Sequence, residues 1–356
     1  MPKWDVIVVG GGAIGMAIAY ELALGGCKVA LVERGELGKQ ASWAAAGMLA
    51  PRAEELEDGP LLQLCLQSLV LYPEWTAQLQ RLSGIDTGYW PCGILRPCLE
   101  GETVAADHLL SCPQLDELQS GLGPQVVSAG WLPNEGQVDN RQLVSSLRAA
   151  LTEVGAIAIP KTEVQQWEID GDRVVAVQTS RGRLEADAFV LAGGAYSSDL
   201  LDIPVRPLKG QMLMVHDPDC QLQHVLYGRG IYIVPRRDGR IVVGATEEDV
   251  GFEDGNTGGA IQSLLQRAIV VFPKIAELTL LETWWGYRPT TPDLLPILGT
   301  GPQDNMYVAT GHHRNGILLV PATARVMARL MLNGDRDSLL QHFSWRRFQA
   351  AELSTV

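Results

Sequence analysis

A glycine-rich stretch near the start of the chain constrains the fold more than any other feature. Within residues 5–33 the sequence reads as an apolar strand at 6–9, glycines at 10, 11, 12 and 15, a helix at 16–24 and a second strand at 29–32. In a dinucleotide-binding βαβ unit the first glycine permits a tight turn, the second lets the backbone approach a pyrophosphate, and the third lets helix and strand pack closely. Gly10, Gly12 and Gly15 match these positions. The stretch therefore predicts a nucleotide site, against the alternative of an ordinary glycine-rich turn.

An acidic residue strengthens this interpretation. Glu33 ends the second strand about 20 residues after the glycines, where a carboxylate accepts hydrogen bonds from ribose hydroxyls. We expect Ala13 and Ile14, which follow the glycines, and Arg34 to line the same site.

Length, charge and cysteines restrict the class of protein. A chain of 356 residues exceeds the size at which a single core usually splits, so two domains are expected. The net charge of -13 and the pI near 4.9 argue against nucleic acid or an anionic membrane as partner. The six cysteines have no CxxC spacing, so we expect reduced thiols in a cytoplasmic protein, although Cys92 and Cys98 could form a bridge. No segment resembles a membrane span, and the first strand begins too early for a signal peptide.

Two further segments are rich in small residues. Residues 41–50 read ASWAAAGMLA, which leaves backbone amides uncovered, so that a flat ligand can lie against them; a tightly packed helix is the alternative. An apolar strand before Gly193 and Gly194 gives a second place where the backbone can meet a phosphate or a flavin ribityl chain, with a plain strand end as the alternative.

Periodicity predicts the remaining elements. Helices are expected at 61–82 (with Leu62, Leu66, Leu69 and Leu79 buried), 141–154 (capped by Asp139 and Asn140), 261–271 and 316–332. Strands are expected at 156–159, 164–169, 174–179, 211–215, 230–235, 240–245, 278–285 and 306–311. Residues 89–133 are broken by prolines and glycines and read as an irregular part of a second lobe. Since most later strands follow one another with a single intervening helix, that lobe is predicted to be α+β with an antiparallel sheet.

Two segments late in the chain carry candidate chemistry. Arg288 follows a strand beside aromatic residues, and its planar fork matches a carboxylate, although a surface counter-charge is the alternative. Residues 311–317 lie between a strand end and a helix start, where the first helix amides would stabilise a negative flavin N1–C2=O locus. The adjacent His312 and His313 would point apart and no third ligand is evident, so no metal site is predicted.

Together, these motifs resemble those of a known protein family. The chain resembles the FAD-dependent amine and amino-acid oxidases of the D-amino-acid oxidase superfamily, and most closely the glycine oxidases tied to thiamine biosynthesis. The matching motifs are the N-terminal glycines and residues 42–49, 209–211, 232–236, 242–246, 286–289 and 311–319, so the resemblance covers nearly the whole chain.

The resemblance implies an α/β FAD-binding domain of Rossmann type (glutathione-reductase-like) and an α+β substrate domain with an antiparallel sheet. The expected boundaries are 1–84, 139–205 and 297–356 for the FAD-binding domain, and 85–138 and 206–296 for the substrate-binding domain.

It also implies the residues of the site. Arg288 would bind the substrate carboxylate, Tyr232 would place its hydroxyl near that carboxylate, and Arg314 would stand at the outer side of the site. The residues expected to hold a non-covalent FAD are Gly10, Gly12, Ala13, Ile14, Gly15, Glu33, Arg34, Ser42, Ala45, Ala46, Gly47, Met48, Val164, Ala192, Gly193, Gly194, Gly311, His313, Arg314, Asn315, Gly316 and Ile317.

The chain departs from the family pattern at three positions. Gly230 replaces a histidine of the glycine oxidases, which enlarges or softens the pocket, and Glu247 replaces a methionine, which could place a carboxylate near the amine. Both changes suggest substrates beyond glycine. Gly286 stands where related sarcosine oxidases attach the flavin to a cysteine, so the FAD is expected to be non-covalent.

The implied reaction is oxidative deamination of glycine or another small amino acid or amine. A hydride would pass from the substrate Cα to flavin N5, and O2 would reoxidise the flavin to give hydrogen peroxide. No protein base is required, because a neutral amine already carries the lone pair that drives hydride loss. The implied partners are the substrate, O2 and, through thiamine biosynthesis, thiazole synthase; a homo-oligomer is expected. The alternatives are a quinone-linked D-amino-acid dehydrogenase of the same fold and a non-catalytic flavin-binding scaffold.

Overall fold

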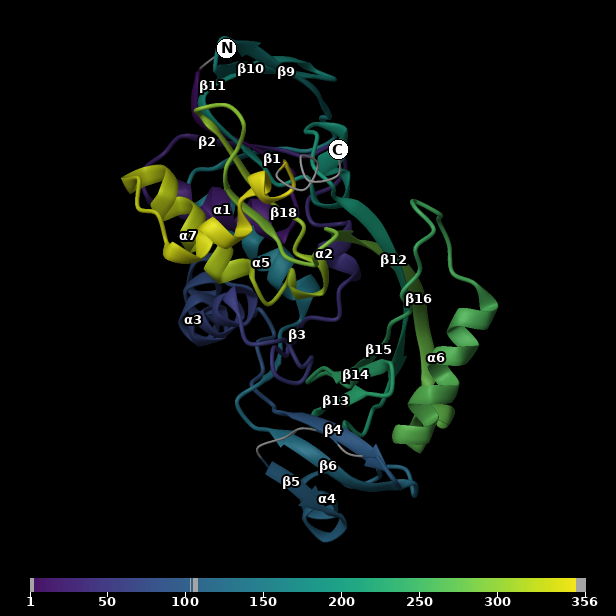
Figure 1. The fold of residues 1–356 in the computed structure, drawn as a ribbon. Coiled ribbons are helices and arrows are strands. Elements are labelled where there is room, and N and C mark those ends of the chain that lie inside the picture. The colour runs from purple at the N-terminus through teal and green to yellow at the C-terminus, as the bar shows by residue number, and fades with distance from the viewer. Residues whose placement is uncertain (1–2, 103, 105–107, 350–356) are drawn as a thin grey trace.

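The computed structural model describes residues 3–102, 104 and 108–349. These residues form two eight-stranded sheets and one two-stranded sheet. Figure 1 shows helices α1, α5 and α7 grouped around the first large sheet, and α6 on the far side of the second. The two large sheets correspond to the two lobes predicted from the sequence.

The first sheet has a parallel centre. Its order is β17-β18-β11-β1-β2-β8, and β9 and β10 continue from the start of β11. Strand β1 lies parallel between β11 and β2, and its consecutive apolar residues suit a strand that is buried on both faces. The strands are β1 (Trp4–Val9), β2 (Val29–Val32), β8 (Ile157–Ile159), β9 (Val164–Asp170), β10 (Arg173–Thr179), β11 (Gly182–Leu191), β17 (Ile297–Thr300) and β18 (Met306–Thr310).

Helices cover one face of this sheet. They are α1 (Ala13–Leu24), α3 (Pro60–Ser83), α5 (Asn140–Glu153) and α7 (Val320–Asn333). Tyr20, Tyr72 and Trp75 are fully buried in the core that these helices share with the sheet. Because β1, β11 and β18 are parallel neighbours, their carboxyl ends lie side by side, and this edge of a parallel sheet is where ligands bind.

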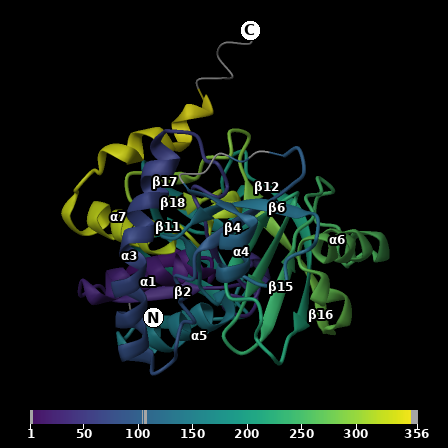
Figure 2. The same ribbon diagram turned by 90° about the horizontal axis from the view of Figure 1, so that it is seen from below.

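The second sheet is antiparallel except for the pair β13 and β4. Its order is β16-β12-β15-β14-β13-β4-β6-β5. Helix α6 (Gly258–Val271) packs on one face, and Figure 2 shows it on the side away from α1. The other face packs against residues 44–53 of the first lobe. The strands are β4 (Ile94–Leu99), β5 (His108–Ser111), β6 (Val126–Leu132), β12 (Arg206–His216), β13 (Val225–Gly228), β14 (Ile231–Pro235), β15 (Arg240–Gly244) and β16 (Thr279–Thr290), with α4 (Cys112–Leu118) beside β6.

Residues 89–133 are where the sequence interpretation was wrong. Much of what the structure describes of this segment is regular, because β4, β5 and β6 extend the second sheet. Proline disfavours strands, but Pro97 lies in β4 beyond the two residues that pair with β13, so its missing N–H removes no hydrogen bond to that strand. The hydrogen-bonded pairing of β4, β5 and β6 with neighbouring strands therefore determines the structure of this segment, rather than its local sequence.

Two helix predictions also need correction. Helix α7 begins at Val320 rather than at 316, because residues 313–315 form a 3-10 turn and a proline follows at the start of the helix. Within 41–50, only α2 (Ala41–Ala44) is helical, and β3 (Met48–Leu49) pairs with β7 (Gly136–Gln137), so the alternative of one packed helix is wrong. In α3, Leu66 and Leu69 are only half-buried, since Tyr72 and Trp75 occupy the inner face.

The Asp139 cap and the free thiols predicted from the sequence are confirmed. The Asp139 carboxylate accepts the N–H groups of Arg141 and Gln142 at the start of α5. All six cysteines are free, so Cys92 and Cys98 form no bridge. In the described part of the chain, no helix combines the length and apolar character needed to cross a membrane.

The sheets divide the chain at positions that support the proposed domains. Strands of the first sheet come from 4–32, 157–191 and 297–310, and those of the second from 94–132 and 206–290. We therefore retain the two-domain division of the chain as a proposal.

Candidate functional site

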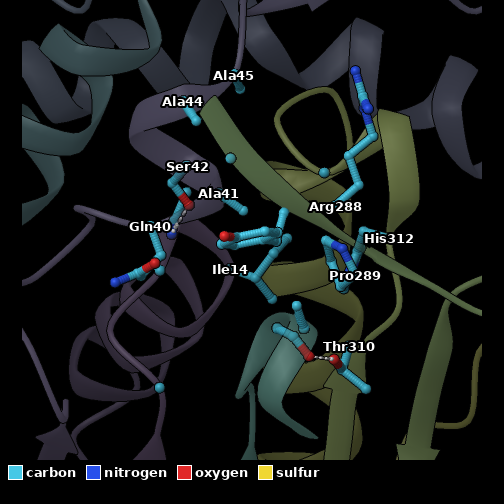
Figure 3. A pocket seen from close by; sticks show the side chains of 18 of the residues that line it. Ile14, Gln40, Ala41, Ser42, Ala44, Ala45, Arg288, Pro289, Thr310 and His312 are labelled. Atoms are coloured by element: carbon cyan, nitrogen blue, oxygen red, sulfur yellow. Dashed lines mark hydrogen bonds between the residues drawn. The ribbon is translucent and has the colours of Figure 1, made fainter. Parts of the chain in front are cut away.

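One cavity collects most of the residues predicted to form the site. It lies at the carboxyl ends of the first sheet and reaches the inner face of the second (Figure 3). Arg288, Tyr232 and Arg314 line it, and so do twenty of the twenty-two residues expected at the cofactor: Gly10, Gly12, Ala13, Ile14, Glu33, Arg34, Ser42, Ala45, Ala46, Gly47, Met48, Val164, Ala192, Gly193, Gly194, His313, Arg314, Asn315, Gly316 and Ile317. Gly15 and Gly311 lie outside the lining.

Gly10, Gly12 and Gly15 have different structural roles. Gly10 has a φ of +112°, and a Cβ there would overlap the Ala192 carbonyl. A Cβ at Gly15 would overlap the Gly10 carbonyl, so both positions are fixed by packing within the chain. A Cβ at Gly12 would meet only the Ser42 Oγ, at 3.3 Å. Gly12 is therefore the glycine whose missing side chain leaves room on the cavity side.

The Glu33 carboxylate is rigidly held. It is 8% exposed, and its oxygens accept the N–H groups of Gly11 and Gly35, each at 2.7 Å. A carboxylate has about four acceptor positions, so lone pairs remain for a ligand hydroxyl. Next to it, the Arg34 guanidinium lies 3.1 Å from the centroid of the Tyr196 ring.

Ser42 has a structural partner that the sequence did not indicate. Its Oγ accepts the N–H of Ala13 at 2.9 Å, so it satisfies an amide at the start of α1, whose own N-cap residue offers no side chain. Asn140 in turn donates from Nδ2 to the carbonyls of Ser42 and Trp43, both at 2.9 Å. Figure 3 shows Ser42 beside Gln40 and Ala41, on the side of the cavity opposite Arg288.

A buried arginine joins the two lobes behind residues 42–47. Arg236 is 5% exposed and donates to the Ala46 carbonyl at 2.8 Å, to the Asn140 Oδ1 at 3.2 Å and to Gln137. Burial lowers the pKa of Arg236 to about 10, and the charge of Asp139 opposes this shift. This role of Arg236 could not be predicted from the sequence, because none of these partners is close to it along the chain.

Arg288 has the properties of an anion-binding group. Its NH1 donates to the carbonyls of Thr246 and Lys209, at 3.2 and 3.4 Å. Among the described residues it forms no ion pair with an acidic side chain. Gly210 makes room for it, because a Cβ there would come within 2.6 Å of its terminal nitrogens. The alternative of a surface counter-charge does not fit this geometry.

The hydroxyl of Tyr232 lies beside this guanidinium. Tyr232 is 7% exposed on β14, and burial raises its pKa, although the charges of Arg288 and Arg314 act in the opposite direction. The phenol is therefore protonated near neutral pH and can donate a hydrogen bond.

Arg314 is engaged with acidic side chains. Its Nε and NH2 contact the two carboxylate oxygens of Glu54 at 3.4 and 3.2 Å, and its NH1 lies 3.5 Å from Glu247. Its NH2 also lies 3.4 Å from the Tyr227 hydroxyl. Burial lowers the pKa of Arg314, but the charge of Glu54 outweighs this effect and holds the pKa above its ordinary value.

The two histidines point to different partners, as predicted. His312 Nε2 lies 3.2 Å from the Thr323 hydroxyl, and His313 Nδ1 lies 3.0 Å from the Thr290 hydroxyl. Burial lowers their pKa values to about 3 and about 4, so both rings are neutral at pH 7. The described residues contain no group of three side chains that could hold a metal ion. Because α7 begins only at Val320, the cavity meets the 3-10 turn of residues 313–315 rather than the first turn of a long helix.

Of the three departures from the family pattern, Gly230 and Glu247 lie outside the cavity lining, whereas Gly286 lies within it. Gly230 does not line the cavity; it has a φ of +71° and lies near Arg267. Glu247 is exposed and pairs with Arg314 instead of lining the cavity. At Gly286, a Cβ would overlap the Ala44 side chain, and no cysteine occurs among the described residues that line the cavity.

Several lining residues were missed. Most of them carry no mark in the local sequence, because tertiary packing brings them to the cavity, although Tyr287 lies within the matched segment 286–289. They include Gln40, Glu54, Thr162, Tyr196, Met212 and Tyr287. Thr162 also had a usable signal, because it lies two residues before Val164, which was expected to hold the cofactor.

Comparisons with known proteins agree with this geometry. The model of the FAD dependent oxidoreductase (DAO) family matches residues 5–330. The bifunctional protein ThiO/ThiG of Trichormus variabilis is 45% identical over 99% of this chain and 56% of its own length. Glycine oxidase of Pseudomonas aeruginosa is 36% identical over 92% of this chain and 94% of its own length.

A solved structure is also similar. The crystal structure of glycine oxidase from Geobacillus kaustophilus superposes with a TM-score of 0.91 at 33% identity, covering 98% of this chain and 99% of that one. The chain spans about half the length of the bifunctional relatives that it matches.

Proposed function

Because the chain belongs to the family of FAD-dependent oxidoreductases, we propose that it oxidises glycine or another small amino acid or amine and passes the electrons to O2. The predicted fold class is confirmed by this membership, and the cofactor is FAD. The likeness to glycine oxidases over nearly the whole chain supports the choice of substrate class.

The residues of the cavity fit FAD. Gly12 leaves space for a pyrophosphate, and Glu33 keeps lone pairs for ribose hydroxyls. Residues 44–47 offer a surface of small side chains that suits the flat ring. When bound, the flavin supplies the redox chemistry, accepting a hydride from the substrate and returning the electrons to oxygen. The absence of a cysteine among the described lining residues supports a non-covalent cofactor.

The observation that carries the proposal is that Arg288 has no acidic partner among the described residues. A guanidinium without an acidic partner in the described chain, on a sheet that faces the cofactor cavity, is suited to a substrate carboxylate. Tyr232 can donate a second hydrogen bond to the same carboxylate, because its hydroxyl lies beside Arg288 and stays protonated. Two fixed contacts at one end of a small amino acid orient its Cα, and such orientation contributes several kcal/mol to catalysis.

No side chain is assigned as a general base. His313 is neutral at pH 7, but its Nδ1 is engaged with Thr290. Tyr232 is protonated and beside a cation. A substrate amine that binds in its neutral form needs no protein base, so the roles of this chain are to bind the carboxylate and to orient the substrate.

We further propose a link to thiamine biosynthesis. The name of the bifunctional ThiO/ThiG relatives supports a functional connection with thiazole synthase. We also propose that Arg314 stands at the outer side of the site. A cytoplasmic location and a homo-oligomer remain predictions.

A peroxide assay tests the proposal. The FAD-loaded protein is incubated in air with a panel of small amino acids and amines, and hydrogen peroxide and the keto or aldehyde product are measured together. We expect equal amounts of peroxide and glyoxylate from glycine. Turnover only with an added quinone would instead indicate a dehydrogenase, and no flavin reduction by any member of the panel would indicate a non-catalytic flavoprotein.

A further inference from the structure

The cavity contains two guanidinium groups in very different electrostatic settings. Arg288, Arg314 and Tyr232 all line it, and the charges of both arginines act to lower the pKa of the Tyr232 phenol. Within the described chain, Arg288 has no acidic partner, whereas Arg314 is bound by Glu54 and Glu247. A substrate therefore meets one compensated cation and one uncompensated cation.

Glu54 provides most of the compensation. Both of its oxygens reach Arg314, and its side chain is only 9% exposed. Glu247 makes a single contact at 3.5 Å and is 53% exposed. Exposed ion pairs are weak because water screens them, so the Glu54 carboxylate dominates the charge of Arg314 as felt in the cavity.

We propose that Glu54 determines substrate specificity: by holding Arg314 it reserves the cavity for substrates with one carboxylate and rejects those with a second acidic group. The inference rests on the proposed function, in which Arg288 binds the first carboxylate. A second carboxylate beside Arg314 would meet the negative charge of Glu54 in a partly buried site. Discrimination of this kind comes from an unfavourable contact with the wrong substrate.

Glu54 is itself held in place by a buried carboxylate. Glu135 is 3% exposed and accepts the N–H groups of Arg52 and Ala53, at 2.6 and 3.1 Å. These are the two residues before Glu54 in the turn of residues 51–55. Glu135 does not line the cavity. It is therefore a positioning residue, which acts on specificity through the turn that presents Glu54.

A binding experiment tests the inference without turnover. Acetate and malonate are titrated into the FAD-loaded protein, and the change in flavin absorbance gives a Kd for each acid. Glu54→Gln is expected to lower the ratio of the malonate Kd to the acetate Kd by about tenfold, the effect of about 1.4 kcal/mol for one partly buried charge contact.

The matched control is Glu55→Gln. It removes the same charge one residue further on, where the carboxylate pairs with Arg96 and not with Arg314. The control should keep the ratio of the unchanged protein. Equal ratios in the Glu54→Gln and Glu55→Gln proteins would overturn the inference.

A turnover experiment separates this inference from the proposed function. Glycine is compared with iminodiacetate, which adds a carboxymethyl group to the glycine nitrogen, and the iminodiacetate-to-glycine ratio of kcat/KM should rise about tenfold in Glu54→Gln. If glycine is oxidised but the ratio does not change, the specificity role is wrong and the proposed function stands. If neither compound is oxidised while malonate binding improves selectively, the proposed function fails and the role of Glu54 stands.

Two further variants keep the test decisive. Glu135→Gln places an NH2 group near backbone N–H donors, so it should shift the Kd ratio in the same direction as Glu54→Gln, but less. A lower melting temperature with an unchanged ratio would make Glu135 purely structural. If Glu54→Gln does not retain FAD, Glu54→Asp withdraws the carboxylate from Arg314 and should also lower the ratio; no change would overturn the inference.

Discussion

The cofactor cradle and the substrate-facing sheet are built on different physical grounds. In the cradle, the decisive groups are backbone: Gly10 and Gly15 are fixed by contacts with carbonyls, and Gly12 keeps one face open. On the sheet, the decisive groups are charged side chains, such as Arg288 and Arg314, whose state depends on residues distant in sequence. Arg314, for example, is compensated by a carboxylate 260 positions away.

Because of this difference, substitutions should have different effects in the two regions. The backbone of the cradle tolerates little substitution, because a side chain at Gly10 or Gly15 would overlap a carbonyl group. A cavity wall made of charges can change its preferred substrate through one carboxylate. We therefore expect cofactor retention and substrate choice to respond to separate substitutions.

The largest expected effect is at Gly12. Gly12→Val would fill the space on the cavity side of the turn, and we expect complete loss of bound FAD, measured as flavin absorbance per mole of purified protein. Gly258→Val is the control, because a Cβ there has nothing within 4 Å. A fully loaded Gly12→Val protein would disprove the pyrophosphate assignment.

Arg236 is the exception to this separation, because it follows β14 of the second sheet but donates to the Ala46 carbonyl beside the cradle, and a substitution there tests this link. Arg236→Gln removes a buried cation that joins β14 to the Ala46 carbonyl and lies 3.7 Å from Asp139. We expect a loss of about 3 kcal/mol in the free energy of unfolding, together with weaker FAD binding. Urea unfolding and FAD titration measure the two effects. Weaker FAD binding would mean that the second sheet supports the cradle, whereas normal binding would leave the regions independent.

Arg288→Ala should weaken the binding of amino acids without changing the binding of FAD. We expect the KM for amino acids to rise about 100-fold, or about 2.7 kcal/mol, since hydrogen bonds to a charged partner are lost, with FAD content unchanged. Arg206→Ala is the control, because Arg206 is an exposed residue of β12 paired with Asp249. Unchanged amino-acid kinetics in Arg288→Ala would remove the carboxylate contact from the mechanism.

The smallest effect concerns the turn at residues 313–315 and its neighbour His312. Burial lowers the pKa of His312 from 6.5 to about 3, so between these values the unfolded chain binds a proton that the folded chain does not. The stabilisation is complete above pH 6.5 and declines as the pH falls, by at most about 1.4 kcal/mol per pH unit. His312→Asn should flatten this slope in urea unfolding at pH 7, 6 and 5, while the exposed His342→Asn should not; identical slopes would contradict the assignment.

The same contrast explains which features the sequence could predict. The glycine turn, Glu33 and the Asp139 cap depend on residues close together in sequence, so spacing alone predicted them. Strands β4, β5 and β6 were missed because their pairing across the sheet is not local. The lobe that contains them was predicted, but not its strands.

The site, too, contains features that the sequence could predict and features that it could not. The sequence predicted that Arg288 and Tyr232 belong to the site, and both line the cavity. It did not predict the pairing of Arg314 with Glu54 or the link made by Arg236, because charge compensation depends on tertiary contacts. Gly230 and Glu247 illustrate the converse error. Their differences from the family pattern suggested a changed pocket, yet neither residue lines the cavity.

The most direct measurement is the anaerobic reduction of the bound flavin by glycine and the other amines of the panel. The FAD-loaded protein and its Arg288→Ala variant are mixed with each substrate without oxygen, and the flavin absorbance is followed. If the cavity oxidises amino acids held by Arg288, the flavin of the unchanged protein will bleach with at least one small amino acid, and the variant will bleach only at much higher substrate concentration. Flavin that stays oxidised with every substrate, or bleaching that is identical in the two proteins, would contradict the central claim.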